Sequence, residues 1–275
     1  MTIAVIGDVG GHAAALRDEL ARLGVPDDGR GPIPADLTVV QVGDLVHRGP
    51  DSEEVVRQVD GYLRRQPGRW VQLIGNHEAQ YVRPRAFQWS PALDPSASDR
   101  VRSWWREGLM RPAAALSVDG ESFVVTHAGI TAPFWRDVLG APTSAAEIAA
   151  ALAALARADA PALFRAGCML QGRDADPLAG PLWAAAATEL TASWIGAELP
   201  VSQVHGHSSA YDWESKAWRL PADLVADARL DEDAKHVTVV LPGGRIVGVD
   251  PDHRATARTP WRAWVVSGGV LVPAG

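Results

Sequence analysis

The feature that most constrains the fold is a repeated pattern in which a short apolar run ends in glycine and is followed at once by polar side chains. The pattern occurs three times near the start of the chain, as Gly7-Asp8 after residues 2–6, Gly43-Asp44 after residues 37–42, and Gly75-Asn76-His77-Glu78 after residues 70–74. A buried strand that ends in glycine delivers the next side chains to the edge of its sheet, where ligands bind. Three such strand ends therefore predict one shared site.

The segments between these apolar runs are predicted to be helical. Residues 12–24 carry apolar side chains at helical spacing and end at Gly24, while residues 53–66 follow a cap at Asp51 or Ser52. Alternating strands and helices of this kind predict an α/β fold.

Two further strands end in the same way. Residues 123–126 lead into His127-Ala128-Gly129, and residues 201–204 lead into His205-Gly206-His207. Toward the end of the chain, two hairpins are predicted, one joining residues 237–241 to 245–249 and one joining 265–266 to 270–272 across Gly268-Gly269. No linker or repeat interrupts the chain. We therefore expect a single domain over residues 1–275, with a helical insert or lid at about 79–115.

Composition excludes several classes of function. The net charge of −7 argues against a nucleic-acid or membrane surface, since either would need a basic patch. Cys168 is the lone cysteine, so the chain forms no internal disulfide and no thiolate zinc cluster. The sequence opens directly into a predicted strand, without the basic and then apolar segments of an export signal. These features favour a cytoplasmic protein; none of them predicts an oligomeric state.

The side chains at the five strand ends are typical metal ligands. They combine oxygen and imidazole donors without thiolates, a mixture that suits manganese, iron or zinc. A carboxylate between two cations could bridge them, and a metal-bound water could then attack phosphorus. Six of the eight histidines lie in or beside these strand ends, which favours a metal site over scattered structural histidines. The candidate ligands are Asp8, Asp44, Asn76, His127 and His207.

These motifs, taken together and in this order, resemble the calcineurin-like metallophosphoesterases. The resemblance is closest to the branch that holds phosphoprotein phosphatases, bacterial Shewanella-like phosphatases and diadenosine tetraphosphatases. It implies a four-layer αββα sandwich with a dimetal centre at the strand ends. The stretches that carry it are Gly7-Asp8-Val9, Gly43-Asp44-Leu45-Val46-His47-Arg48-Gly49-Pro50, Gly75-Asn76-His77-Glu78, Thr126-His127-Ala128-Gly129, Gly180-Pro181-Leu182-Trp183 and Gly206-His207-Ser208.

The resemblance also implies roles for single residues. Asp8 would bind the first metal and Asp44 would bridge both, whereas the second metal would be held by Asn76, His127 and His207. His77 would be the general acid that protonates the leaving oxygen. Arg48 would hold phosphate oxygens, and Asn76 would also face the substrate. His12, His205 and Glu78 would support the ligands or join them. One or two divalent cations are expected, with manganese favoured over iron or zinc.

Three positions depart from the family pattern. Gly10 stands where the family has a histidine ligand of the first metal, and His47 stands where an aspartate pairs with the general acid. Residues 184–186 are alanines where a phosphate-binding arginine is expected. Three interpretations remain open: His47 completes the first metal site, His12 or His205 completes it, or the first site is weak or empty.

The expected function is metal-dependent hydrolysis of a phosphomonoester, on a phosphoprotein or a small molecule. One alternative is a pyrophosphohydrolase that acts on dinucleoside polyphosphates or nucleotides. A second alternative is a degenerate family member that binds a phosphorylated ligand with weak or no hydrolysis. Retention of the candidate acid His77 favours an enzyme, because binding alone would not need it.

Overall fold

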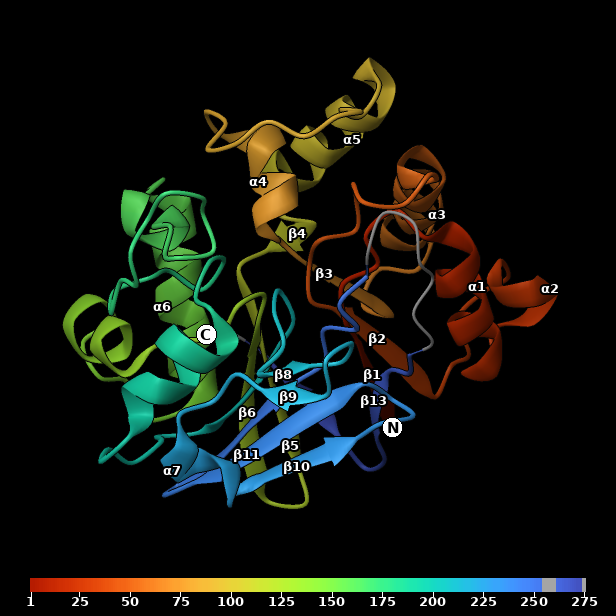
Figure 1. The fold of residues 1–275 in the computed structure, drawn as a ribbon. Helices are drawn as coiled ribbons and strands as arrows, with labels where there is room; N and C mark the ends of the chain where they lie inside the picture. The colour runs from red at the N-terminus through yellow and green to blue at the C-terminus, as the bar shows by residue number, and fades with distance from the viewer. Residues whose placement is uncertain (254–260, 274–275) are drawn as a thin grey trace.

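The structure is a computed structural model that describes residues 1–253 and 261–273 (Figure 1). Within these residues two large sheets and one small sheet form. The first sheet has the strand order β13 (Trp264–Val266), β1 (Thr2–Ile6), β2 (Leu37–Gln41), β3 (Trp70–Leu73) and β4 (Met110–Arg111). The second has the order β10 (Ala228–Asp231), β11 (His236–Leu241), β12 (Gly244–Gly248), β7 (Ser202–His205), β6 (Glu121–Thr126), β5 (Ala113–Val118) and β14 (Val270–Val272). The small sheet pairs β8 (Tyr211–Asp212) with β9 (Ala217–Trp218).

The helical segments mostly connect these strands. The α-helices are α1 (Ala13–Arg22), α2 (Pro26–Gly29), α3 (Ser52–Arg65), α4 (Asn76–Val82), α5 (Pro95–Arg106), α6 (Ala145–Arg157) and α7 (Ala222–Val225). Short π-helical segments cover Phe134–Val138 and Ala186–Thr191, and 3₁₀ turns cover Pro161–Phe164 and Ala192–Trp194. None of the helices within the described ranges is long and apolar enough to cross a membrane.

The two large sheets pack face to face, and helices cover their outer faces. Strand alternation explains this arrangement, because Ile3 and Val5 point into the core shared with Phe123 and Val204, whereas Ala4 and Ile6 point outward. The outward face of the first sheet packs against α1 and α3, and α6 packs against β5 and β6 (Figure 1). The residues of the segment Ala186–Thr191 join a separate core that includes residues of β11 and β12. The predicted four-layer αββα arrangement is therefore confirmed.

Parallel pairing brings the strand ends together. In the first sheet β1, β2 and β3 run parallel, and in the second sheet β6, β7 and β12 run parallel. The carboxyl ends of each set open at one edge, so the residues that follow them meet across the gap between the sheets. This edge is the candidate site.

Two segments differ from the prediction. The predicted insert at 79–115 holds the end of α4 and all of α5, but from Met110 onward the chain belongs to β4 and β5. The predicted hairpin across Gly268-Gly269 is wrong: β13 pairs with β1 in the first sheet, whereas β14 pairs with β5 in the second. Gly268 has a left-handed backbone (φ 73°), and a Cβ on Gly269 would lie only 2.9 Å from Ile3 Cδ1. The glycines thus form the crossing between sheets.

Candidate active site

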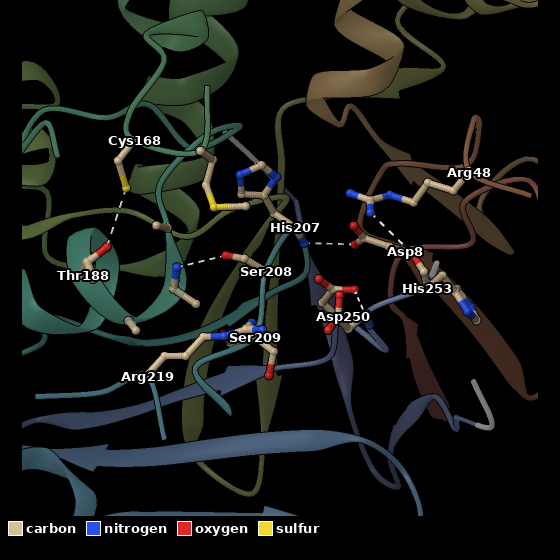
Figure 2. Close-up of a pocket in the computed structure, with 15 residues that line it drawn as sticks. Asp8, Arg48, Cys168, Thr188, His207, Ser208, Ser209, Arg219, Asp250 and His253 are labelled. Atoms are coloured by element: carbon tan, nitrogen blue, oxygen red, sulfur yellow. Dashed lines mark hydrogen bonds between the residues drawn. The ribbon is translucent and has the colours of Figure 1, made fainter. Parts of the chain in front are cut away.

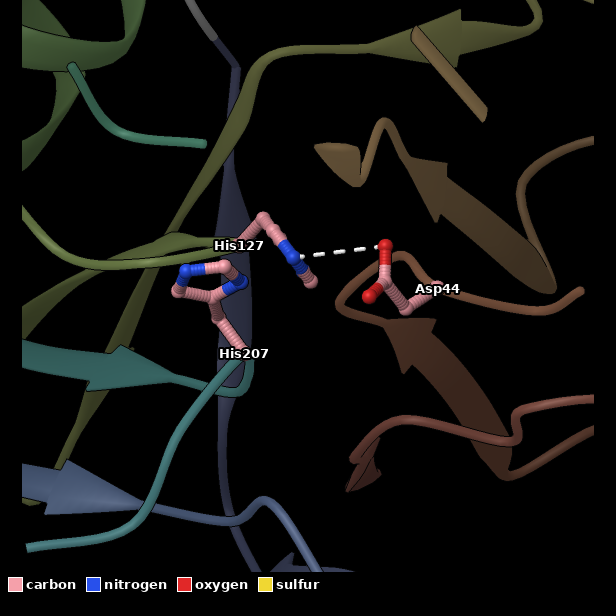
Figure 3. A group of neighbouring side chains, drawn as sticks. All are labelled: Asp44, His127 and His207. Carbon is pink, nitrogen blue, oxygen red and sulfur yellow. Dashed lines mark ion pairs between the residues drawn. The ribbon is translucent and has the colours of Figure 1, made fainter. Parts of the chain in front are cut away.

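Ligand-type side chains from both sheets converge at the shared edge. Asp44 follows β2, His127 follows β6 and His207 follows β7, and each is buried (Figure 3). His127 Nε2 lies 3.4 Å from Asp44 Oδ1 and 3.1 Å from Asn76 Oδ1. Among the histidines, cysteines, aspartates and glutamates of the described part of the chain, Asp44, His127 and His207 form a group of three whose ligand atoms all lie within 4.8 Å of one another. Asn76 lies beside this group. The structure therefore brings together the four candidate ligands of the second metal.

The hydrogen bonds of His127 leave its inward nitrogen free to bind a cation. Its Nδ1 lies 3.0 Å from the Val42 carbonyl oxygen and donates to it, so Nε2 carries the lone pair that faces Asp44. Burial lowers the pKa of His127 and, more strongly, the pKa of His207. Both rings are therefore neutral at physiological pH, as metal ligation requires.

Asn76 lies among acceptors. Turned with its nitrogen inward, the amide group donates to Asp44 Oδ2 over 3.1 Å and to His207 Nδ1 over 3.3 Å. Turned the other way, its carbonyl oxygen joins these lone pairs, an arrangement that only a cation satisfies. The Asn76 side chain can therefore donate hydrogen bonds in the metal-free site and supply a ligand oxygen in the metal-bound site.

Glu78 fixes the loop that carries Asp44. Its carboxylate accepts the amides of Asp44 (2.7 Å), Leu45 (2.9 Å) and Gly75 (3.0 Å). Burial and the Asp44 charge raise the pKa of Glu78 to about 8, and these three amides oppose that rise. Gly75 is required here, because a Cβ at this position would collide with the Asp44 carboxylate. Glu78 therefore holds the ligand loop by its amides.

Asp8 lies on the other side of the centre, in a cavity of about 380 Å³. Its Oδ1 accepts the His207 amide over 3.0 Å, and Arg48 reaches toward it across the cavity (Figure 2). Burial, together with Asp250 and Asp44, raises the pKa of Asp8. Burial and Asp252 raise the pKa of Asp250 to about 6. Crowded buried carboxylates of this kind are relieved by a cation.

Asp250 is a site residue that the sequence analysis missed. It lies two residues beyond β12, which runs parallel to β7, and it lines the same cavity as Asp8. The sequence pattern that marks the other strand ends is also found here, because Val249-Asp250 ends an apolar run.

Gly10, which stands where the family has a histidine ligand, is surrounded by other side chains. Gly10 has a left-handed backbone (φ 53°), and a Cβ there would lie 3.4 Å from Arg48 Cδ and 3.7 Å from His253 Cβ. The His253 ring packs on His12 with centroids 4.7 Å apart. His205 instead has its Nδ1 2.8 Å from the Gly206 carbonyl, and burial lowers its pKa to about 4.

His47 pairs with the candidate acid. Its Nδ1 lies 2.7 Å from His77 Nδ1, and its Nε2 lies 2.7 Å from the Tyr81 hydroxyl. With both ring nitrogens engaged in this way, neither is available to the first metal, which argues against His47 as a ligand. The other nitrogen of His77, Nε2, lies 3.8 Å from Asp44 Oδ2 and so faces the metal centre.

Aromatic rings enclose this histidine pair. Trp89 stacks on His47 at 5.7 Å between centroids and lies 4.9 Å from the His77 ring, and Phe87 lies 5.1 Å from His77. The guanidinium carbon of Arg48 lies 5.8 Å from the Trp89 centroid. Phe87 and Trp89 are half-buried, so they form an apolar wall beside the candidate acid that the sequence analysis did not predict.

Several site residues hold a backbone conformation that side chains disfavour. Asp44, His47, Arg48 and His207 have φ values of 53°, 72°, 64° and 66°. Left-handed backbone at residues other than glycine is costly and clusters at functional sites, where the surrounding structure maintains it.

Comparison with known proteins places this geometry in a family. The sequence model of the calcineurin-like phosphoesterase family matches residues 1–158, more than half of the chain. The chain belongs to this family. The match confirms the resemblance predicted from the motifs, and the family binds divalent metals, so the group Asp44, His127 and His207 is a candidate metal site.

Two curated relatives align with parts of this phosphoesterase chain. The symmetrical bis(5'-nucleosyl)-tetraphosphatase of Edwardsiella ictaluri is 32% identical over 164 residues, which cover 56% of the chain and 52% of that protein. An uncharacterised protein of Schizosaccharomyces pombe is 32% identical over 115 residues, covering 38% and 34%. The chain thus spans about half or less of these relatives.

Solved structures show a looser likeness. The cold-active protein-tyrosine phosphatase of a psychrophilic Shewanella species is 17% identical, with a TM-score of 0.44 over 94% of this chain and 80% of that one. A metallophosphoesterase from Sphaerobacter thermophilus is 22% identical, with a TM-score of 0.29 over 47% of each chain.

Proposed function

We propose that this chain is a divalent-metal-dependent phosphoesterase that hydrolyses phosphomonoesters. The observation that carries the proposal is the convergence of the buried residues Asp44, Asn76, His127 and His207 beside His77. A bound cation would be coordinated by these acceptors, whose lone pairs otherwise face one another.

The donor set fits a borderline cation. Asp44 and Asn76 supply oxygens, His127 and His207 supply imidazole nitrogens, and no thiolate lies among these four donors. Manganese suits this mixture, as do iron and zinc. When bound, the metal would polarise the phosphoryl group and lower the pKa of a water molecule.

The protein's own residues would orient the substrate. Arg48 reaches into the cavity beside Asp8, where its planar guanidinium can pair with two phosphate oxygens (Figure 2). His77 directs Nε2 toward Asp44 and would supply a hydrogen to the leaving oxygen there. Phe87 and Trp89 would cover the leaving group and exclude water from it.

A second candidate is hydrolysis of a dinucleoside polyphosphate. The cavity continues from Asp8 and Arg48 to Arg219, which gives a second guanidinium within the same space. Arg219 is held by Asp212 at 2.8 Å and by the Ser209 carbonyl at 3.2 Å. One of the curated relatives is named as a bis(5'-nucleosyl)-tetraphosphatase. A second phosphate could therefore extend toward Arg219.

The products of hydrolysis distinguish the candidates. The purified chain is incubated with manganese and with para-nitrophenyl phosphate, phosphotyrosine or diadenosine tetraphosphate, and products are separated by ion-exchange chromatography. Free phosphate from the monoesters supports the first proposal, and nucleotide products alone support the second. Turnover of none of them, with retained metal and retained phosphate binding, would make the chain a binding protein. Asp44→Asn is the inactive control, because it removes the carboxylate that would hold the metal together with His127 and His207.

A further inference from the structure

Tyr81 extends the histidine pair into a chain of three side chains. It lies one helical turn after His77 on α4, and the residue is 7% exposed. Its hydroxyl oxygen lies 2.7 Å from His47 Nε2 and accepts the Leu93 amide over 3.0 Å. No sequence pattern predicts this contact, because residues 47, 81 and 93 lie on separate segments.

The Leu93 amide sets the direction of hydrogen donation along these three side chains. A backbone amide can only donate, so the Tyr81 oxygen accepts there and its own hydrogen is available for His47 Nε2. His47 then carries its hydrogen on Nδ1 and donates it to His77 Nδ1 over 2.7 Å. His77 in turn carries its hydrogen on Nε2, the nitrogen that faces Asp44 Oδ2.

The opposite direction would leave a buried donor unsatisfied. If His77 Nδ1 donated to His47, then His47 Nε2 would donate to Tyr81, and the tyrosine oxygen would accept from both His47 and Leu93. The tyrosine hydrogen would then have no acceptor among the contacts of the described residues. Buried hydroxyl groups without an acceptor are costly, so the first direction prevails.

The rings in this chain are held in place. Trp89 stacks on His47 with the two ring planes 10° apart, and the His47 amide donates to Ser52 Oγ over 2.9 Å. His47 therefore has little freedom to turn away from His77.

We propose that Tyr81 and His47 are positioning residues that hold neutral His77 with its hydrogen on Nε2, aimed at the leaving oxygen. The benefit of this arrangement to catalysis rests on the proposed function, whereas the position of the hydrogen atoms is independent of it. In place of a carboxylate that attracts a proton, this site uses a directional series of hydrogen bonds. The donor nitrogen of His77 is thereby fixed before the substrate arrives.

Nuclear magnetic resonance of the histidine ring nitrogens tests the placement directly. Nitrogens with and without a hydrogen have well-separated ¹⁵N shifts, so long-range ¹H–¹⁵N spectra report each tautomer. The metal-free and zinc-loaded proteins are both measured, since zinc is diamagnetic. We expect a hydrogen on His77 Nε2 and on His47 Nδ1 in both. A hydrogen on His77 Nδ1 in the unsubstituted protein would overturn the proposal.

Two matched substitutions at position 47 should have opposite effects on the position of the His77 hydrogen. Asparagine and aspartate tolerate the left-handed backbone there (φ 72°) and have nearly the same shape, but asparagine can donate a hydrogen bond whereas aspartate is charged and can only accept one. We expect His47→Asn, with its amide directed at His77, to preserve the hydrogen on His77 Nε2. We expect His47→Asp to place a hydrogen on His77 Nδ1. The same His77 signals in both variants would contradict the proposal.

Tyr81→Phe removes the hydroxyl that orients His47. We expect a mixture of tautomers at His47 and His77, and a fall in kcat of about 10- to 100-fold with little change in KM, as for other groups that orient a histidine. Tyr62→Phe is the matched control: Tyr62 is also buried and bonds the Gly29 carbonyl at 2.9 Å, and it should change neither signal nor kcat. Unchanged His77 signals in Tyr81→Phe would refute the positioning role. If the unsubstituted protein hydrolyses no phosphoester, the proposed function fails while the spectra still decide the hydrogen placement.

Discussion

His47 and His77 face each other through their Nδ1 atoms at 2.7 Å, so the candidate acid is paired with a second imidazole and not with a carboxylate. Burial lowers the pKa of His77 to about 4 and the pKa of His47 to about 3. Both rings are therefore neutral near pH 7, and the protonated form of His77 is populated only in acid.

The first prediction concerns pH. Neutral His77 can donate only a hydrogen bond from Nε2 to the leaving oxygen, whereas the imidazolium can transfer a proton to it. Since the pKa of His77 is lowered, the imidazolium becomes more abundant as the pH falls from 7 toward 5, and turnover of a substrate with a poor leaving group should rise. His47→Asp places an opposite charge beside His77 and raises its pKa, so the optimum should move toward neutral pH. Profiles of kcat against pH measure this shift. An optimum that stays at the same pH in the variant would show that His47 does not control the acid.

The second prediction concerns the leaving group. His77→Asn removes the hydrogen donor and should lower kcat by roughly 10²- to 10⁴-fold for an alkyl phosphate. The loss should be smaller for para-nitrophenyl phosphate, because that leaving oxygen needs little protonation. Metal content, measured by mass spectrometry, should not change. Equal losses for both substrates would reject the role of general acid.

The third prediction concerns metal content. The second metal position has four converging donors, whereas Gly10 supplies no ligand to the first. After mild dialysis we expect about one ion per chain, as the donor count suggests. His127→Ala should reduce this content, whereas Asp8→Asn should leave most of it. Two firmly retained ions per chain would contradict the prediction.

The sequence predicted the parts of the site that depend on local pattern. Strand ends at Asp44, Asn76, His127 and His207 were visible because apolar runs and glycines mark them, and parallel pairing then brings them together. The sequence does not predict the role of Tyr81, because its partner His47 is distant in sequence. The hairpin prediction at Gly268 failed because the spacing of two apolar runs does not reveal which sheet each one joins.

The fourth prediction concerns the stability of the metal-free protein. The pKa of Asp250 is raised from 3.8 to about 6, so the folded state holds its proton more tightly than the unfolded chain does. Stability is therefore lost as the pH rises from about 4 to about 6, by up to roughly 3 kcal/mol at 1.4 kcal/mol per tenfold change in binding. Asp250→Asn removes this loss and still accepts the Asp252 amide, which bonds Asp250 Oδ1 at 2.8 Å.

Urea unfolding at pH 4.5 and pH 7.5 measures the effect. The variant should gain stability at pH 7.5 and little at pH 4.5. Asp212→Asn is the control, because amide donors and Arg219 lower the pKa of Asp212, and its removal should not stabilise the protein. A variant without extra stability at pH 7.5 would show that Asp250 carries no such penalty.

The division of β13 and β14 between two sheets has a consequence for synthesis on the ribosome. β1 is made first, yet its neighbour β13 lies more than 250 residues later in the chain. Until that strand emerges, one edge of β1 keeps its backbone groups unpaired, and the outer edge of β5 waits for β14 in the same way. Unpaired strand edges in partly made chains invite association with other chains. The growing polypeptide should therefore need chaperone protection until its last strands close both sheets.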